Sequence, residues 1–349
     1  MRSPHSRRIL AASIAVVALA AVAAVLVSTA GGSKSTSKAT LTLYSGQHPQ
    51  TVNAIVSAFE KATGISVAVR QDDEGVLASQ IMQEGSHSPA DVFMTENSPA
   101  LEALGTRGLL ARVGPAALAK TSAKYSSSRK DWEGVSARIS TIVYNTDKLK
   151  KSELPRSVMD LAQPKWKGKL ALAPTETDFQ PIVTAVAARY GKARAEQWLS
   201  GIRSNASGHI YPDNESLVSQ VNSGQVQLGV INNYYWYRLR DEVGASKVHS
   251  AAALFAPGDA GYVIDVAGAG ALKSSKHAAE AQKFLAFLVG PVAQKIIASD
   301  ESYEYPLGSG VKTTKDLIPF ATLRPDPITV KQLGTGGLAI SLLRSASLL

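Results

Sequence analysis

Residues 41–64 read LTLYSGQHPQTVNAIVSAFEKATG, and this stretch contains one complete unit of the predicted fold. The β-rich run over 41–44 predicts a strand. Pro49 suits the first position of a helix, and Gly64 suits the residue that ends one. Between them, apolar residues recur at the i, i+3, i+4, i+7 spacing of an amphipathic helix: Val52, Ile55, Val56 and Phe59. The stretch therefore predicts a strand, a turn and a helix.

The same order recurs along the chain. After a strand at 65–69, further strands are predicted over 91–94, 170–173 and 226–231, each followed by a turn and a helix that ends near residue 104, 190 or 242. Alternation of short β-rich runs with amphipathic helices is typical of an α/β fold built around largely parallel sheets. A later helix is predicted over 274–289, and a single closing helix is predicted within 329–349.

Side chains that can bind ligands occupy the turn after four of these strands. They are His48, Glu96, the pair Glu176 and Asp178, and the pair Tyr234 and Tyr235. In open α/β sheets, ligands collect at the carboxyl ends of the strands, where helix N–H groups point outward. We therefore expect these turns to form one site.

Two long extended segments predict a molecule with two lobes. Residues 135–144 and 261–268 are interrupted by small residues and are long enough to pass from one lobe to the other. A chain that crosses more than once between lobes has a hinge, and the cleft between the lobes is the natural binding site. We expect lobe 1 to comprise 40–140 plus 262–312, and lobe 2 to comprise 141–261 plus 313–349.

The N-terminal segment predicts export. Basic residues in 2–8 precede an apolar run over 9–27, which ends in Ser28-Thr29-Ala30. This pattern predicts a signal peptide over 1–30 and a linker over 31–39, although a run of this length also suits an uncleaved membrane anchor. We expect the rest of the 349-residue chain to lie outside the cytoplasm, in a periplasm or tethered to the membrane by that anchor.

Composition excludes several kinds of site. The chain has no Cys, so it can hold no disulfide, Fe–S cluster or thiolate zinc site. Of the net charge of +9, Arg2, Arg7 and Arg8 contribute three, and the remaining basic residues form no stripe with interleaved aromatics, so we expect no nucleic-acid partner. Motifs of zinc peptidases, serine hydrolases and nucleotide-binding loops are also missing from the sequence.

Tyr234 and Tyr235 admit two interpretations. They can pack as aromatics at the start of a helix, or they can bind a metal as phenolates. A phenol has a pKa near 10, so only a hard, highly charged cation such as Fe(III) repays its ionisation. His48 is either a helix cap or a neutral imidazole ligand, and Glu96 is either a first-turn acid or a carboxylate ligand. Two phenolates and one carboxylate match the charge of Fe(III).

Four stretches resemble the ferric-iron-binding periplasmic proteins of iron(III) ABC transporters: LTLYSGQH at 41–48, DVFMTENSPALEAL at 91–104, LAQPKWKGK at 161–169 and NYYWY at 233–237. The likeness extends from about residue 40 to at least 311. It implies a type II periplasmic-binding-protein fold that holds Fe(III) in a cleft between two hinged lobes. It also implies the metal ligands His48 and Glu96 from one lobe and Tyr234 and Tyr235 from the other.

Many members of that family add a small anion, carbonate or phosphate, held at the amino end of a helix. The corresponding residues here are Asn97, Thr175, Glu176, Thr177, Asp178, Asn214 and Asn233. This sequence departs from the family at Glu176 and Asp178, since two carboxylates would repel an anion. Either these acids point into solvent, or one of them substitutes for the anion.

The resemblance implies an exported, non-catalytic and monomeric binding protein. It would capture ferric iron, free or as a chelate, and deliver it to the membrane permease of an ABC importer. Capture of another small solute, such as a phosphonate or a phosphorylated metabolite, is the first alternative, because a fold alone does not choose its ligand. A metal-dependent hydrolase that uses His48 and Glu96 is the second, but two phenolates would leave little room for an activated water.

Overall fold

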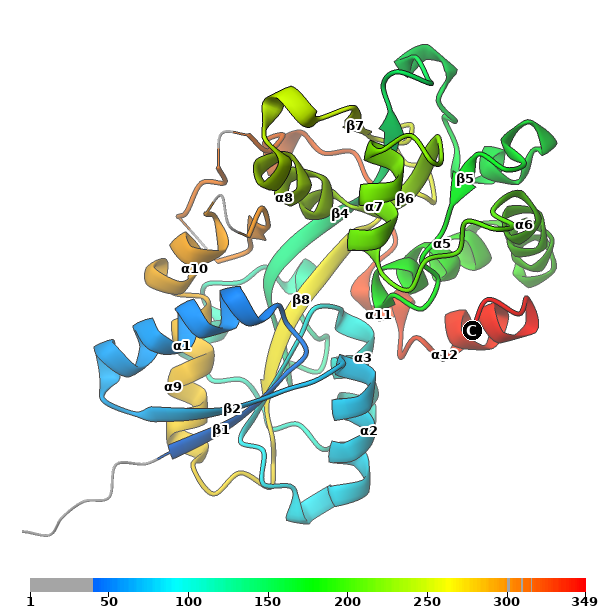
Figure 1. Cartoon of the computed structure of the whole chain (residues 1–349). Coiled ribbons are helices and arrows are strands. Elements are labelled where there is room, and N and C mark those ends of the chain that lie inside the picture. The colour runs from blue at the N-terminus through cyan, green and yellow to red at the C-terminus, as the bar shows by residue number, and fades with distance from the viewer. Residues whose placement is uncertain (1–39, 300–301, 309, 315) are drawn as a thin grey trace, which may run out of the picture. The chain divides into compact units, whose positions relative to one another are not determined.

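The structure is a computed structural model that describes residues 40–299, 302–308, 310–314 and 316–349 (Figure 1). The predicted signal segment 1–30 and linker 31–39 lie outside the described residues. Within the described part of the chain, no helix is long and apolar enough to cross a membrane. The α/β class predicted from the sequence is confirmed.

Lobe 1 is built on a sheet with helices on both faces. Its strands are β1 (Thr40–Ser45), β2 (Ser66–Gln71), β3 (Val92–Thr95), β8 (Ile264–Ala271), the first part of β4 (Glu133–Asn145) and the short β9 (Tyr305–Pro306). Helices α1 (Pro49–Thr63), α9 (Ala278–Leu288) and α10 (Pro291–Ile297) share one core, and α2 (Glu74–Glu84) and α3 (Ser98–Thr106) share another. Leu43 lies in the first core and Tyr44 in the second, because successive side chains of a strand point to opposite faces. The short α4 (Pro115–Leu118) also contributes to the first core.

The opening stretch of the sequence folds as predicted. Helix α1 begins at Pro49 and ends before Gly64, whose φ of 71° caps the helix in the left-handed region. The four periodic apolar residues of this helix are all buried. The loop before it requires glycine, because a Cβ at Gly46 would lie 2.5 Å from the Cβ of Glu74. The turn that carries His48 is thereby packed closely against the start of α2.

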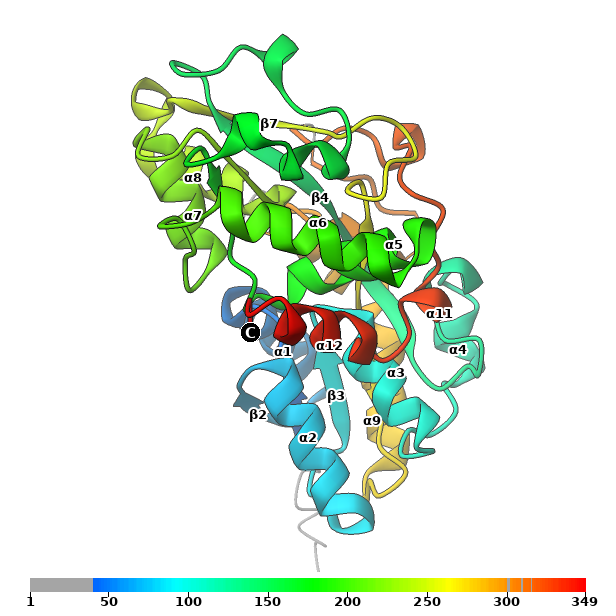
Figure 2. The same cartoon turned by 90° about the vertical axis from the view of Figure 1, so that its right-hand side faces the viewer.

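Lobe 2 has its own sheet and core. Its strands are β5 (Leu170–Ala171), β6 (Leu228–Asn232), β7 (Ser250–Ala253) and the second part of β4. Its helices are α5 (Gln180–Tyr190), α6 (Lys192–Asn205), α7 (Asn214–Asn222), α8 (Asn233–Val243) and α12 (Gly337–Ser345). The short α11 (Val330–Leu333) contacts both α3 of lobe 1 and α5 of lobe 2. Figure 2 shows α12 along α5 and α6, and its buried Leu342 and Leu343 belong to the lobe 2 core. Short 3-10 helices lie in the connections at Gly85–His87, Ala123–Tyr125, Lys151–Glu153, Val158–Ala162, Pro164–Trp166, Thr177–Phe179, Ala245–Lys247 and Phe320–Thr322.

Strand β4 belongs to both sheets. Up to Ile139 it pairs with β8, and from Ser140 onward it pairs with β6. Figure 1 shows β4 and β8 running side by side through the middle of the molecule. This is the crossing that the long segments 135–144 and 261–268 predicted, although β8 begins at Ile264. The exact lobe boundaries given above stay a prediction.

Two expectations about the elements are wrong. The sheets are mixed: β1 pairs in parallel with β2 and β3, and β5 with β6, whereas β4 and β8 are antiparallel to their neighbours. The reason is that the two crossing strands run in opposite directions. The closing segment forms two helices, because Gly334 and Gly336 adopt φ values of 62° and 77° between α11 and α12.

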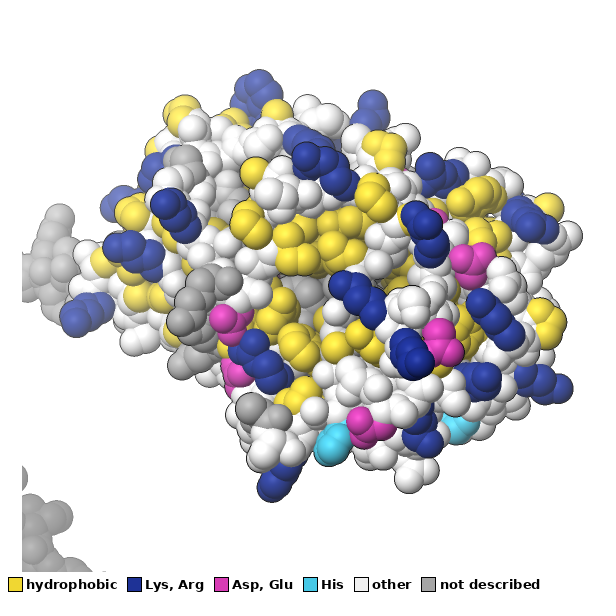
Figure 3. All heavy atoms as spheres, turned by 90° about the horizontal axis from the view of Figure 1, so that it is seen from above, with side chains coloured by type: hydrophobic (Ala, Val, Ile, Leu, Met, Phe, Trp, Pro, Cys, Tyr) yellow, Lys and Arg dark blue, Asp and Glu magenta, His cyan; other side chains and the backbone are white. Residues whose placement is uncertain are grey.

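Positive charge is dispersed on the face shown in Figure 3. Lys and Arg side chains are scattered there among hydrophobic and uncharged ones, and they do not join into a stripe.

Candidate functional site

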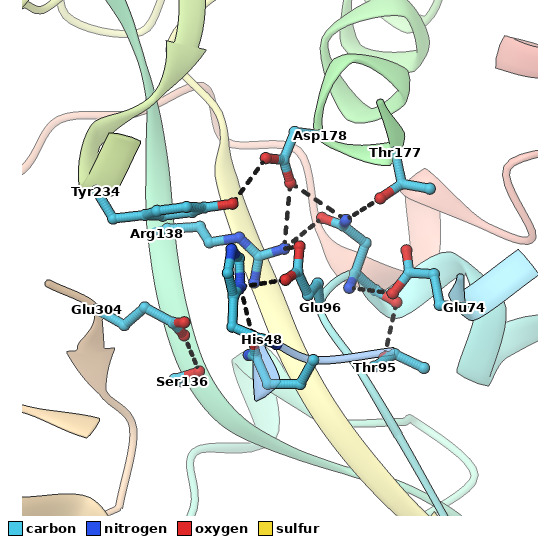
Figure 4. Close-up of polar contacts among 12 residues, drawn as sticks. His48, Glu74, Thr95, Glu96, Ser136, Arg138, Thr177, Asp178, Tyr234 and Glu304 are labelled. Atoms are coloured by element: carbon cyan, nitrogen blue, oxygen red, sulfur yellow. Dashed lines mark hydrogen bonds and ion pairs between the residues drawn. The ribbon is translucent and has the colours of Figure 1, made fainter. Parts of the chain in front are cut away.

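The carboxyl ends of four strands converge on one polar cluster (Figure 4). His48 follows β1, Glu96 follows β3, Asp178 lies in the 3-10 helix after β5, and Tyr234 lies in the first turn of α8 after β6. The sequence predicted that these turns form one site, and the structure brings them together. These four turns therefore form a single site.

His48 touches the other three sequence-predicted metal ligands or lies beside them. Its Nδ1 contacts the Glu96 carboxylate and lies 2.9 Å from Gln47 Oε1. Its ring is edge-on to Tyr234, with centroids 5.0 Å apart, and lies 6.3 Å from the ring of Tyr235. Because Pro49 follows it, His48 keeps an extended backbone, with φ −49° and ψ 128°, at the N-cap of α1.

The two tyrosines are buried side by side, with ring centroids 4.1 Å apart. The hydroxyl of Tyr234 donates to Asp178 Oδ2 at 3.2 Å, and the guanidinium of Arg238 lies 4.6 Å from the Tyr234 ring centre. Burial, with the negative charges of Asp178 and Glu96, raises the pKa of both phenols well above 10. Both are therefore neutral donors unless a strong cation draws off the proton.

The remaining two candidate ligands are also held in defined protonation states. Burial, assisted by the positive charge of Arg238, lowers the pKa of His48 to about 4. The imidazole is therefore neutral at pH 7 and keeps a lone pair for a metal. Burial raises the pKa of the Glu96 carboxyl well above its usual range, opposed by the positive charge of Arg138. Burial therefore favours the uncharged forms of all four candidate ligands, and a bound cation would be needed to stabilise the anionic forms of Glu96 and the tyrosines.

Arg138 is a site residue that the sequence analysis missed. It lies in the middle of β4 and is fully buried. Its Nη2 lies 3.1 Å from Asn97 Oδ1, 3.2 Å from Asp178 Oδ1 and 3.7 Å from Glu96 Oε2. The sequence signal was a single Arg within the otherwise uncharged segment 135–144, which ordinarily indicates a solvent-exposed position.

Glu74 at the start of α2 was missed as well. It accepts a hydrogen bond from the backbone N–H of Asn97 at 2.9 Å. Burial, with the negative charge of Glu96, raises the pKa of Glu74 to about 8. The carboxyl thus anchors the turn that carries Glu96 without adding a full negative charge to the site at pH 7.

The residues predicted for an anion divide into two groups. Asn97, Thr177 and Asp178 lie together in the cluster: Asn97 Nδ2 donates to Thr177 Oγ1 at 2.9 Å and to Asp178 Oδ1 at 3.3 Å. Asp178 therefore points into the site and not into solvent. Burial and the charge of Asp178 raise the pKa of the half-buried Glu176 to about 8, and its Oε1 accepts from the backbone N–H of Asn214 at 3.4 Å.

The other predicted anion contacts point elsewhere. Thr175 is exposed, and its hydroxyl donates to the Pro212 carbonyl at 3.0 Å. The Asn233 amide is used at both ends by backbone groups, since Oδ1 accepts from the Ile139 N–H and Nδ2 donates to the Tyr303 carbonyl, each at 2.9 Å. Asn233 thus ties α8 to β4 and does not present its amide to a ligand.

The side chains of the four predicted ligands limit which metal ion the site could bind. Among the described residues, no group of three or more His, Cys, Asp or Glu side chains is arranged to hold a metal ion. The four predicted ligands supply one imidazole, one carboxylate and two phenols. A metal held by the four predicted ligands would therefore need tyrosinate, which suits Fe(III) and does not suit Zn(II) or Ca(II).

Comparison with known proteins places this geometry in a family. The chain is 36% identical over 295 residues to the Fe(3+)-binding periplasmic protein of Serratia marcescens, which covers 84% of this chain and 87% of that protein. It is 36% identical over 312 residues to the major ferric iron-binding protein of Neisseria meningitidis, with coverages of 89% and 93%.

A solved structure agrees. Iron-bound HitA from Pseudomonas aeruginosa superposes with a TM-score of 0.85 at 42% identity, over 88% of this chain and 99% of that chain. The sequence model of the bacterial extracellular solute-binding proteins matches residues 45–295. The chain therefore belongs to the bacterial extracellular solute-binding protein family.

Proposed function

We propose that this protein captures Fe(III) between its two lobes through His48, Glu96, Tyr234 and Tyr235. The observation that carries the proposal is the contact of His48 with Glu96 beside the adjacent phenols of Tyr234 and Tyr235. The relatives named above are ferric-iron-binding proteins, which supports the same cargo for this chain. Binding would proceed by loss of the two phenol protons as the cation enters.

Charge balance supports iron over a divalent ion. Two phenolates and the Glu96 carboxylate supply three negative charges, and His48 is neutral. The other charged groups around His48 are Arg138, Arg238, Asp178 and Glu304, two positive and two negative, so their charges cancel. A trivalent cation therefore leaves the site neutral, whereas a divalent cation would leave an uncompensated buried charge, which is costly.

We further propose that the protein acts outside the cytoplasm as a carrier and hands its iron to the permease of an ABC importer. Its family consists of extracellular solute-binding proteins, and its named relatives are periplasmic binding proteins, not enzymes. The hydrolase alternative has less support, because His48 and Glu96 have no third His, Asp or Glu ligand among the described residues. A phosphorylated solute has less support because its charge would face Asp178 and Glu96.

The test is the colour of the iron-loaded protein. Ferric citrate added to the iron-free protein should produce a broad visible band from charge transfer between tyrosinate and iron. Tyr234→Phe or Tyr235→Phe should weaken or remove the band, since each change deletes one anionic ligand and keeps the ring. Tyr237→Phe is the matched control, because this tyrosine is in the same helix but donates to the Asp316 carbonyl. A colourless complex, or a band that survives both changes, would reject the assignment.

A further inference from the structure

Arg138 faces a second carboxylate that the proposed iron site does not use. In the antiparallel ladder of β4 and β8, Arg138 is paired directly with Asp265. Directly opposite residues in such a ladder project from the same face of the sheet, with Cβ atoms about 5 Å apart. Both side chains are buried, with 0% of Arg138 and 1% of Asp265 exposed. A guanidinium and a carboxylate are therefore neighbours in the interior.

Neither group is fully satisfied in this arrangement. All the polar contacts of Arg138 described above are made by Nη2, which reaches Asp178, Asn97 and Glu96. Among the described residues, Arg138 Nε and Nη1 have no hydrogen-bond partner, and the Asp265 carboxylate, which lies beside the Asn232 side chain, is not hydrogen-bonded to Arg138. Burial, with the charge of Asp178, raises the pKa of Asp265 to about 8. Buried ionisable groups left without partners in a native structure call for an explanation.

Arg138 has three carboxylate neighbours: Glu96, which follows β3 of lobe 1 and is a proposed iron ligand, Asp178 and Asp265. The last two differ in how they are attached to it. Asp178 lies in the 3-10 helix that follows β5, within the region assigned to lobe 2. Asp265 lies on β8, which is hydrogen-bonded to β4 beside Arg138 itself. Separation of the lobes would carry Asp178 away from Arg138 and would leave Asp265 in place. The arginine would then be a buried cation that has lost its main partner.

We propose that Asp265 is a positioning residue that takes over Arg138 when the lobes separate, and so stabilises the open, iron-free state. The inference rests on the proposed function, because opening is assigned to the release of iron. Glu96 would stay beside Arg138 in both forms, and the second anionic partner would change from Asp178 in the closed form to Asp265 in the open form. The exchange keeps the guanidinium paired in both states and makes opening less costly.

The exchange has a thermodynamic consequence for iron. A ligand that binds the closed state is held more tightly when the open state is destabilised. Removing the negative charge at Asp265 should therefore favour closure, tighten iron binding and slow iron release. Removing the negative charge at Asp178 should favour the open state, weaken iron binding and speed iron release. The coordination sphere itself should be unaffected by the change at Asp265, because none of the four proposed ligands contacts it in the described structure.

The experiment compares Asp265→Asn with wild type, with and without iron. Small-angle scattering of the iron-free variant should give a smaller radius of gyration than iron-free wild type. Iron release to a competing chelator should be slower, with affinity about tenfold higher. The visible band of the loaded variant should keep its position. In Asp178→Asn the iron-free radius of gyration should instead equal or exceed that of wild type.

Glu133→Gln is the matched control. Glu133 is also on β4, buried and without a partner for its carboxyl among the described residues, but it is paired with Ala269 and lies five residues from Arg138. It should change neither the radius of gyration nor iron release. Scattering and release in Asp265→Asn equal to wild type, or an equal change in Glu133→Gln, would overturn the exchange. Absence of the visible band in wild type would instead reject the iron proposal.

Discussion

At the scale of single residues, we propose that Asp178 determines whether the site binds an added anion. It lies in the 3-10 helix that leads into α5, and its carboxylate already accepts hydrogen bonds from Nη2 of Arg138 and from the hydroxyl of Tyr234. An added anion would have to displace this carboxylate from Arg138 and would then be repelled by its negative charge from a distance of a few Å. We propose that Asp178 supplies a negative charge that an anion from solution would otherwise provide.

We therefore expect iron binding to depend little on added anion in wild type and strongly in Asp178→Asn. The amide keeps the shape of the side chain but frees Arg138 to bind phosphate or carbonate. Iron is titrated into anion-depleted protein, first without any anion and then with either phosphate or carbonate added. The ratio of the iron affinities with and without the anion measures this dependence.

Glu176→Gln is the comparison for that experiment. Glu176 is half-buried and its described contact is with the backbone N–H of Asn214, so its amide variant should alter the anion dependence much less. Wild-type affinity that rises steeply with phosphate or carbonate, and is the same in both variants, would show that Asp178 does not stand in for the anion.

Glu133 gives a pH-dependent prediction away from the site. Burial raises the pKa of Glu133 to about 9, whereas an unfolded chain has a Glu pKa near the ordinary value of about 4.3. The folded state therefore binds the proton more tightly. Stability is greatest below the unfolded pKa and falls as pH rises between these two values, by up to about 1.4 kcal/mol per pH unit.

Glu133→Gln should remove this slope, because the amide resembles the protonated acid. Chemical denaturation should show little change in unfolding free energy near pH 5 and a stabilisation of about 1 to 4 kcal/mol near pH 8. Glu196→Gln is the control, since Glu196 is on the surface with only an i,i+4 pair to Lys192. Equal pH slopes for wild type and Glu133→Gln would contradict the buried-acid account.

The site residues that the sequence analysis found lie at the ends of strands, whereas the residues that it missed do not. His48, Glu96 and Tyr234 each follow a strand and precede or begin a helix, so the rule that ligands collect at strand ends could place them together. Arg138 and Asp265 lie within strands, where the sequence alone cannot tell whether a polar side chain faces solvent or a second lobe. Their partners come from parts of the chain that only the folded topology brings near.

At the scale of elements, the bounds of a helix could be predicted from the residues at its ends, but the relative direction of paired strands could not be predicted. The bounds of α1 follow from Pro49 and Gly64, which act on the backbone next to them. The antiparallel pairing of β4 with β8 depends on how the chain passes twice between lobes, which no periodicity within either strand records. The break between α11 and α12 occurs at Gly334 and Gly336, and the sequence alone does not reveal that these two glycines adopt positive φ values.

Helix α12 is held to lobe 2 by apolar burial, which gives a prediction at this scale. Leu342 is fully buried in the lobe 2 core. Leu342→Ala should lower the free energy of unfolding by about 2 to 5 kcal/mol, the usual range for deleting a buried leucine side chain. Denaturant unfolding measures the loss.

Leu338 in the same helix is the matched control, because it is 46% exposed. Leu338→Ala should change the unfolding free energy by no more than about 0.5 kcal/mol. Similar losses in the two variants would mean that α12 is not anchored by its buried face.

At the scale of the whole described unit, the site is also the contact between the lobes. Asn97 lies after β3 of lobe 1 and donates to Thr177 after β5 of lobe 2, and the His48 ring lies edge-on to that of Tyr234. The connection through β4 and β8 lies beside this contact, so a rotation about the two strands would open the site and separate the proposed ligands into His48 with Glu96 and Tyr234 with Tyr235. Neither half alone carries enough anionic donors to neutralise Fe(III).

Iron should therefore draw the lobes together, because only the closed form offers all four ligands to one ion. Small-angle scattering of wild type should show the radius of gyration falling when ferric iron is added to iron-free protein. The variant with both Tyr234→Phe and Tyr235→Phe keeps the rings that pack in the cleft but lacks the anionic donors on lobe 2, so iron should leave its scattering unchanged. If iron compacts that variant as much as wild type, closure does not depend on tyrosinate bridging. If it compacts neither while the visible band appears in wild type, the metal is held without lobe motion, and the hinge assigned to β4 and β8 would have no part in iron capture.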